Sequence, residues 1–287
     1  MYERIIVGYD GSDPSKAALK ESSLWASKHG GKVLLVHGVY FDQEEFAIPP
    51  SLMEKRVAEA SRILAEARGT ASKDHGLDGR VEVMVREGEP PDVIAKIAAA
   101  EKADLIALGT FGRSGLKKLL VGSVTAEVIL KAPCDVLVVK RPCDSCIGTY
   151  SSILVPFDGS EFSKRALGRA IDLAKSEGAK LTVLYVIPRY EEMVEFFRTG
   201  SIERSLRAAA EKVVESAQKI ASDRGVQAAA EIGEGHAADE IVRRVSELAN
   251  GLVVMGTHGW KGVSKAIVGS TTNRVITYST TPVLVVR

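Results

Sequence analysis

The sequence predicts an α/β protein made of two tandem Rossmann-like domains, each a five-stranded parallel sheet flanked by helices. Two observations predict this fold class. The chain repeats itself at an offset of about 147 residues, and in each copy short apolar, β-rich runs alternate with longer amphipathic stretches. Alternation of strand and helix along a chain is typical of parallel strands that are joined by helical crossovers and covered on both faces.

The internal repeat is the size of a domain rather than of a solenoid unit. Residues 5–12 correspond to residues 153–160, and each half closes on a Val-Leu-Val-Val run. Between these ends, block 105–130 matches block 252–277 at twelve of its twenty-six positions without gaps. Agreement of this extent indicates a duplicated domain.

The domain limits follow from this repeat and from local composition. A chain of 287 residues is long enough for about two ordinary domains. Segment 141–151 holds Pro, Gly and small polar residues without an amphipathic period, which is typical of a linker. We therefore expect a first domain at 1–140 and a second at 152–287.

The expected elements follow the apolar periodicity of each half. In the first half it predicts strands near 4–9, 32–39, 80–86, 104–109 and 135–140, and helices near 13–29, 50–74, 90–101 and 123–131. In the second half it predicts strands near 152–157, 180–187, 226–232, 251–256 and 282–286. The runs at 104–109 and 252–255 are almost wholly apolar, as in strands buried on both faces.

Composition narrows the classes of function. The 38 Lys and Arg nearly balance the 37 Asp and Glu, so no overall charge favours nucleic acid or acidic membranes. The first residues enter a strand-like run, and no stretch of about 18 apolar residues exists, so we expect neither a signal peptide nor a membrane span. Three cysteines make no disulfide framework, which indicates a reducing, cytoplasmic location.

A glycine-rich loop recurs in both halves with one spacing. Two glycines three positions apart follow a buried strand, and after nine more residues a Gly-Ser pair opens a helix. Glycines let the backbone turn sharply and approach a ligand, a helix start attracts phosphate, and Ser123 and Ser270 are natural N-caps. The alternative is ordinary connection chemistry, but retention of the spacing while residues between drift favours a ligand loop. The loop residues are Gly109, Gly112, Gly122 and Ser123, and Gly256, Gly259, Gly269 and Ser270.

A carboxylate follows the first strand of each half, at Asp10 and Asp158, and each precedes Gly-Ser. In an open parallel sheet the first and fourth strands often flank the point where strand order reverses, and ligands bind there. Asp10 would then face the loop at Gly109, and Asp158 the loop at Gly256. Such a carboxylate can accept hydrogen bonds from ribose hydroxyls. The alternative is that both aspartates only cap the helices that follow.

These motifs resemble the universal stress protein family over essentially the whole chain, as two tandem domains of its ATP-binding branch, with an adenine nucleotide α-hydrolase-like fold. The resemblance implies that the two aspartates face ribose and adenine and that the loop residues meet ribose and phosphates. It adds Gly38 and Val186, late in the second strands, as backbone contacts to adenine, and Leu108 and Met255 as residues that pack nearby.

The resemblance also implies dimerisation, which a tandem chain can satisfy by internal pairing of its halves, with a homo-oligomer as a further possibility. Two positions depart from the family pattern. Gly8 stands where proline is frequent, as at Pro156, and Gly38 stands where valine is usual, as at Val186. We therefore expect the second site to bind its nucleotide more tightly.

Three other features are given plainer interpretations. Cys143 and Cys146 form a CxxC pair in the linker, but no second ligand pair accompanies them, so we interpret them as incidental. His258 lies within the second loop, but its counterpart is Phe111, which disfavours a shared catalytic role. Asp92 and Asp239 are interpreted as charges in the first turn of a helix.

The sequence thus favours a regulatory protein that binds ATP, with Mg²⁺, at one site per domain and acts on an unidentified protein partner, without being an enzyme. No Gly-x4-Gly-Lys-Ser/Thr loop is present, and no base is paired with a nucleophile. The alternative is a slow ATPase that uses the same site. A third hypothesis is a structural dimer module that has lost its nucleotide.

Overall fold

The structure is a computed structural model. It describes residues 2–40, 50–110, 121–140, 142–188, 200–259 and 267–287. The chain divides into two compact units, Met1–Thr149 with Arg287, and Tyr150–Val286. The linker limits expected at 141 and 151 stay a prediction.

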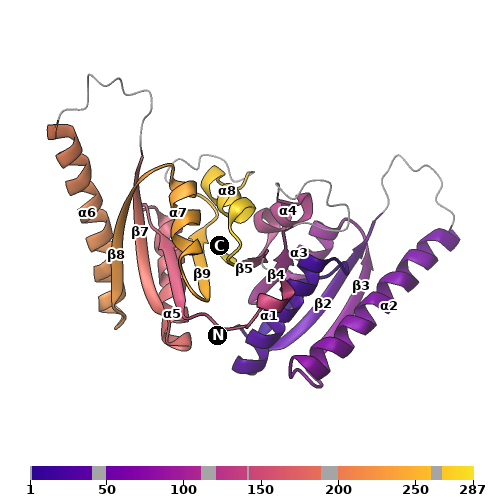
Figure 1. Cartoon of the computed structure of the whole chain (residues 1–287). Helices are drawn as coiled ribbons and strands as arrows, with labels where there is room; N and C mark the ends of the chain where they lie inside the picture. Colours follow the sequence, from indigo (N-terminus) through magenta and orange to yellow (C-terminus); the bar gives the residue numbers. More distant parts are fainter. Residues whose placement is uncertain (1, 41–49, 111–120, 141, 189–199, 260–266) are drawn as a thin grey trace. The chain divides into compact units, whose positions relative to one another are not determined.

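The first unit contains five strands and four α-helices in its described residues, in strict alternation (Figure 1). In chain order these are β1 (Arg4–Gly8), α1 (Asp13–His29), β2 (Lys32–Val39), α2 (Pro50–Asp74), β3 (Val81–Glu87), α3 (Pro90–Ala100), β4 (Leu105–Gly109), α4 (Ser123–Lys131) and β5 (Asp135–Val139). A short 3-10 helix, η1 (Cys143–Ser145), follows.

The second unit repeats this order in its own described residues (Figure 1). Its elements are β6 (Ser152–Pro156), α5 (Glu161–Glu177), β7 (Lys180–Pro188), α6 (Gly200–Asp223), β8 (Ala228–Gly235), α7 (Ala237–Ser246), β9 (Gly251–Gly256), α8 (Ser270–Tyr278) and β10 (Val283–Val286). The duplicated α/β architecture is therefore confirmed.

Each unit has one parallel sheet between two helical layers. The strand order is β3-β2-β1-β4-β5 in the first unit and β8-β7-β6-β9-β10 in the second. α1 contacts α2 while α3 contacts α4, and the second unit pairs α5 with α6 and α7 with α8 in the same way. The central strands are buried on both faces, as their continuous apolar runs predict, and β9 is buried along its whole length.

The helix that follows the first strand of each unit has well-defined ends. α1 begins after the N-cap Ser12 and ends at Gly30, whose φ of 74° is left-handed. α5 begins after Ser160 and ends at Gly178, whose φ is 66°. A serine cap and a left-handed glycine are common signals of the start and the end of a helix.

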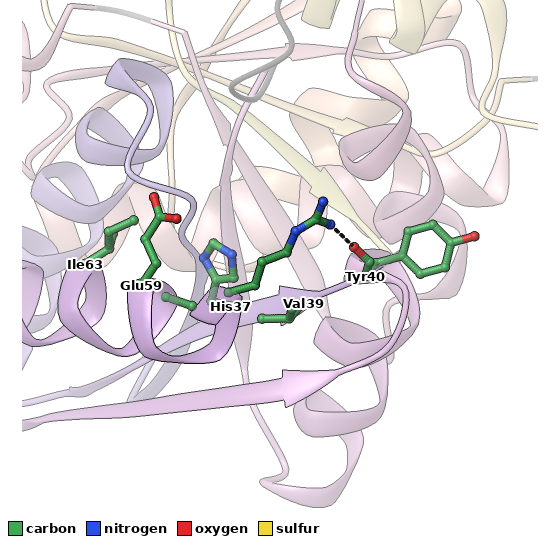
Figure 2. A pocket seen from close by; sticks show the side chains of 8 residues that line it. His37, Val39, Tyr40, Glu59 and Ile63 are labelled. Carbon is green, nitrogen blue, oxygen red and sulfur yellow. Dashed lines mark hydrogen bonds between the residues drawn. The ribbon is translucent and has the colours of Figure 1, made fainter. Parts of the chain in front are cut away.

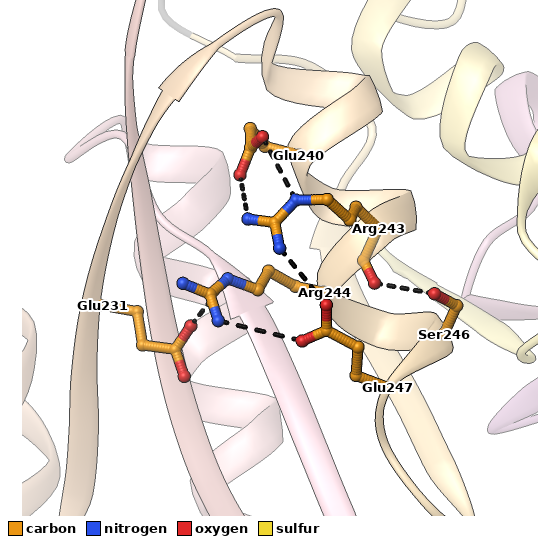
Figure 3. A network of polar contacts seen from close by, with 6 residues as sticks. All are labelled: Glu231, Glu240, Arg243, Arg244, Ser246 and Glu247. Carbon is orange, nitrogen blue, oxygen red and sulfur yellow. Dashed lines mark hydrogen bonds and ion pairs between the residues drawn. The ribbon is translucent and has the colours of Figure 1, made fainter.

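The two units differ where the third helix meets the sheet. In the second unit Glu231 of β8 pairs with Arg244 of α7 at 3.1 Å, and Arg244 and its neighbour Arg243 also pair with Glu247 (Figure 3). In the first unit, Met84 stands in place of Glu231 and the buried Ile97 in place of Arg244, so both positions are apolar. The duplicated fold therefore accommodates apolar residues at these two positions in one unit and an ion pair in the other.

Candidate functional site

The reversal of strand order falls beside the first strand of each unit. β1 pairs with β2 on one side and β4 on the other, and β6 lies between β7 and β9 in the same way. Ligands of open α/β sheets bind beyond the strand ends at this point. Asp10 lies two residues beyond the end of β1, and Asp158 two residues beyond the end of β6. Both aspartates therefore occupy the expected switch point.

Each of these carboxylates fixes a tight turn. Oδ1 of Asp10 accepts the N–H of Ser12 at 3.0 Å and its hydroxyl at 2.6 Å. Oδ1 of Asp158 accepts the N–H of Ser160 at 3.0 Å. The glycine between has φ of 81° in the first turn and 82° in the second, a conformation that costs other residues strain.

The serines of these turns, and not the aspartates, cap the helices. The Ser12 hydroxyl accepts the N–H three residues on at 3.4 Å, and the Ser160 hydroxyl does the same at 3.2 Å. The alternative that Asp10 and Asp158 only cap α1 and α5 is therefore wrong. Each carboxylate instead orients the residue that does the capping.

The first loop glycine of each unit packs against the helix that follows this turn. A Cβ on Gly109 would lie 2.5 Å from Cβ of Pro14 and 2.6 Å from its carbonyl carbon. A Cβ on Gly256 would lie 2.7 Å from Cβ of Phe162 and 3.0 Å from its carbonyl carbon. The requirement for glycine here therefore has a packing cause, and this packing holds the loop beside the carboxylate turn.

The base of each loop is closed by a backbone hydrogen bond. Gly122 donates its N–H to the carbonyl oxygen of Thr110 at 2.6 Å, and Gly269 donates to that of Thr257 at 2.9 Å. These threonines were not among the predicted site residues. Their identity in both copies of the repeat was the available signal.

A second threonine ties the helix after each loop to the strand before it. Thr125 donates its hydroxyl to the carbonyl oxygen of Gly109 at 2.7 Å, and Thr272 donates to that of Gly256 at 2.9 Å. Each hydroxyl comes from the first turn of α4 or α8, so these bonds fix the helix start relative to the strand end. These threonines are also identical in the repeat and were also missed.

The expectation that Ser123 and Ser270 are N-caps is wrong. The N-caps are Gly122 and Gly269, without a side-chain cap bond, and the serines are the first helical residues. Each glycine donates its N–H to the threonine carbonyl that closes the loop base, and its backbone is not helical, with φ and ψ of −60° and 145° at Gly122 and −54° and 141° at Gly269. The first-turn N–H groups that follow have no acceptor within the helix, which suits them to bind an anion.

The second loop glycine meets the carboxylate in the second unit. A Cβ on Gly259 would lie 2.7 Å from Oδ2 of Asp158. The loop and the carboxylate therefore converge at one place, as the repeat predicts. Its counterpart Gly112 lies outside the described residues.

A cavity of about 260 Å³ lies at the end of β2 in the first unit (Figure 2). It is lined by His37, Gly38, Val39, Tyr40, Arg56, Glu59, Ala60 and Ile63. Nδ1 of His37 lies 2.7 Å from the carbonyl oxygen of Tyr9, the residue before Asp10. Ile63 would lie 3.2 Å from a Cβ on Gly11, so the cavity adjoins the carboxylate turn.

Comparison with known proteins agrees with this geometry. The sequence model of the universal stress protein family matches residues 1–140 and again 149–287. The chain belongs to the universal stress protein family.

Relatives of this family match either one unit or the whole chain. A universal stress protein of Mycolicibacterium smegmatis is 27% identical over 99% of this chain and 96% of its own. One from Thermus aquaticus is 32% identical over 49% of this chain and 100% of its own. The crystal structure of a universal stress protein from Archaeoglobus fulgidus superposes with a TM-score of 0.68 at 22% identity, covering 99% of this chain and 98% of that one. The structural likeness supports the tandem fold.

The remaining residues that the family pattern implies lie on the strands around the switch point. Val186 pairs with Gly233 late in β7, as Gly38 pairs with Arg86 late in β2. Leu108 and Met255 are buried and directly precede the first loop glycines, where they were expected to pack.

The cysteines and other metal-binding side chains form no further site among the described residues. No group of three or more His, Cys, Asp or Glu that could hold a metal ion occurs there. Cys146 is buried with its Sγ 3.4 Å from the carbonyl oxygen of Ala17, and the side chain of Cys143 lies outside the described part. Burial, together with Asp135, raises the pKa of the Cys134 thiol to about 12. In the same residues no helix combines the length and apolarity that crossing a membrane requires.

Proposed function

We propose that this universal stress protein binds one ATP in each unit and uses the nucleotide as a regulatory ligand. The observation that carries the proposal is the convergence of loop and carboxylate, seen where Gly259 meets Asp158. Together with the start of α8, this convergence gathers a negative group and a set of N–H donors at one sheet edge. A nucleotide offers the complementary pair, hydroxyl donors on its ribose and anionic phosphates.

The roles of the groups follow from their chemistry. Asp10 and Asp158 would accept hydrogen bonds from ribose hydroxyls, and the first turns of α4 and α8 would hold phosphate oxygens. The cavity beside β2, at about 260 Å³, is slightly smaller than the roughly 300–1,000 Å³ of common ligand pockets. It would take the base end of the ligand, with the phosphates over the loop.

Mg²⁺ would bind at each site together with the phosphates of ATP. Mg²⁺ commonly keeps several waters and is bound through substrate phosphates with one or two carboxylates. The donor set of the described residues fits that mode, because one aspartate stands at each site. Occupancy would then change the surface that the loops present to a protein partner, without a chemical step.

Titration with Mg-ATP and mass spectrometry of ligand released from freshly purified protein test the proposal. We expect two nucleotides per chain, and loss of one in each of Asp10→Ala and Asp158→Ala. Asp92→Ala and Asp239→Ala are matched controls, because these aspartates lie in exposed first turns and pair with a Lys or Arg of the next helix.

Three outcomes would contradict this reading. Absence of released nucleotide together with no binding at millimolar Mg-ATP would leave a structural module. Full stoichiometry in the double aspartate variant would place the ligand elsewhere. Multiple turnovers of ATP that disappear in the aspartate variants would make the protein a slow ATPase.

A further inference from the structure

One histidine side chain joins the two sides of the second loop. Nδ1 of His258 lies 3.0 Å from the hydroxyl of Thr257, just after β9. Its Nε2 lies 2.6 Å from the carbonyl oxygen of Ile267, three residues before α8 begins. The imidazole therefore connects the two described ends of the second glycine-rich loop.

The partners of this ring define its tautomer. A carbonyl oxygen can only accept, so Nε2 of neutral His258 carries the hydrogen, and Nδ1 is left to accept the hydroxyl hydrogen of Thr257. Thr257 is only 3% exposed, and a buried hydroxyl without a hydrogen bond is costly. One ring thus satisfies the buried hydroxyl of Thr257 and also binds the carbonyl oxygen of Ile267, an exposed residue.

The ring is also packed against the helix of the carboxylate turn. Its centroid lies 5.3 Å from that of Phe162, in the first turn of α5, and Arg165 places its guanidinium 4.9 Å from the Phe162 centroid. The next residue, Gly259, faces Oδ2 of Asp158. Fixing the His258 ring therefore fixes the approach of the loop to the carboxylate.

The described residues of the first unit lack this arrangement. Phe111 stands in place of His258 and has no ring nitrogen. Thr110, the counterpart of Thr257, is only 2% exposed, and within the described residues its hydroxyl has no hydrogen-bond partner. Thus the same buried hydroxyl is satisfied by a side chain in the second unit, whereas the described residues of the first unit provide no such partner.

We infer that His258 is a positioning residue that holds the described ends of the second nucleotide loop, at Thr257 and Ile267, in place for the ligand, and that no described residue of the first unit does the same for Thr110. The inference rests on the proposed function, because the loop is taken to be a nucleotide loop. A site that is already ordered loses less conformational freedom when it binds, so its affinity is higher. The duplicated chain would then carry one site held by His258 and one in which phenylalanine stands at the corresponding position.

Exchange of the two residues tests this inference in both directions. His258→Phe gives the second loop the residue of the first, and Phe111→His does the reverse. For His258→Phe we expect a roughly tenfold weaker Mg-ATP affinity at the second site and, without ligand, faster hydrogen exchange of the Gly269 amide, whose bond to Thr257 closes the loop. For Phe111→His we expect tighter binding at the first site, and sites are assigned in Asp10→Ala and Asp158→Ala backgrounds.

Two further measurements keep the test decisive. Nitrogen-15 NMR of the His258 ring should show the tautomer with hydrogen on Nε2, and the opposite tautomer would overturn the inference. Thr257→Val removes only the Nδ1 partner, so it should give a smaller loss than His258→Phe and serves if that variant does not fold. Unchanged hydrogen exchange and unchanged Mg-ATP affinity in both His258→Phe and Thr257→Val would also overturn the inference. If no Mg-ATP binds to either unit, the proposed function fails, while the exchange and NMR results still decide the role of His258.

Discussion

Substitution of two glycines in one loop should separate packing from ligand binding. In Gly256→Ala the new Cβ would lie 2.7 Å from Cβ of Phe162 and 3.0 Å from its carbonyl carbon and oxygen. Relief requires the first turn of α5 to shift, and overpacking of this kind costs about 1–3 kcal/mol. In Gly259→Ala the described atoms nearest the methyl would be Oδ2 of Asp158 at 2.7 Å and its Cγ at 3.9 Å, both in a side chain of the candidate site. We therefore expect Gly256→Ala to lower stability and Gly259→Ala to lower nucleotide affinity.

Urea unfolding and thermal melting followed by circular dichroism give the first quantity, and Mg-ATP titration gives the second. For a domain of this size, a loss of 1 kcal/mol lowers the melting temperature by about 4 °C. Gly69→Ala is the control, because it lies in α2 with nothing within 4 Å of the new Cβ, and alanine there should stabilise by up to about 1 kcal/mol. The reasoning is refuted if Gly256→Ala is as stable as the parent chain, or if Gly259→Ala unfolds as early as Gly256→Ala.

Three further changes have outcomes that the structure defines. Thr272→Val should lower the free energy of unfolding by about 1 kcal/mol in urea, because it removes a 2.9 Å bond to a strand-end carbonyl, whereas Thr272→Ser should keep it. Arg244→Ile should lower the free energy of unfolding more than the double variant Glu231→Met/Arg244→Ile, because the single change leaves the Glu231 carboxylate without its arginine partner. Equal losses of stability in the two variants would contradict this. Because the pKa of Cys134 is raised from 9.0 to about 12, its burial should cost no stability below pH 9 and an increasing amount from pH 9 towards 12. Cys134→Ala should remove that alkaline loss, and iodoacetamide should label the folded thiol slowly at pH 8.

The helices and strands were predictable because the same apolar periodicity occurs in both halves of the chain. The helices expected at 13–29, 50–74 and 123–131 have those limits in the structure. The strand expected at 226–232 instead runs from Ala228 to Gly235. Its alanines and glutamates carry little apolar alternation, so the sequence could not define its limits.

The sequence predicted where the candidate site lies on the fold, but not the role of each residue in it. Spacing and strand order placed Asp10 and Asp158 at the switch point, where the structure has them. The same pattern could not show that Gly256 is required by a neighbouring helix, because that depends on a contact across the fold. Nor could it show that Gly269 rather than Ser270 is the N-cap of α8. The bond that holds Gly269 joins its backbone N–H to the backbone carbonyl of Thr257, and so leaves no side-chain signal.

The departure of Gly38 from the family pattern also has a packing cause. A Cβ at this position would lie 2.8 Å from Cα of Pro90 and 3.2 Å from its nitrogen, so the start of α3 occupies the space that valine would need. In the second unit, Val186 is accompanied by Ala237 at the matching helix position. Gly38 and Pro90 therefore form one alternative pair, and Val186 and Ala237 the other. The weaker first site expected from Gly8 and Gly38 stays a prediction, and the proposed role of His258 gives a second reason to expect tighter binding at the second site.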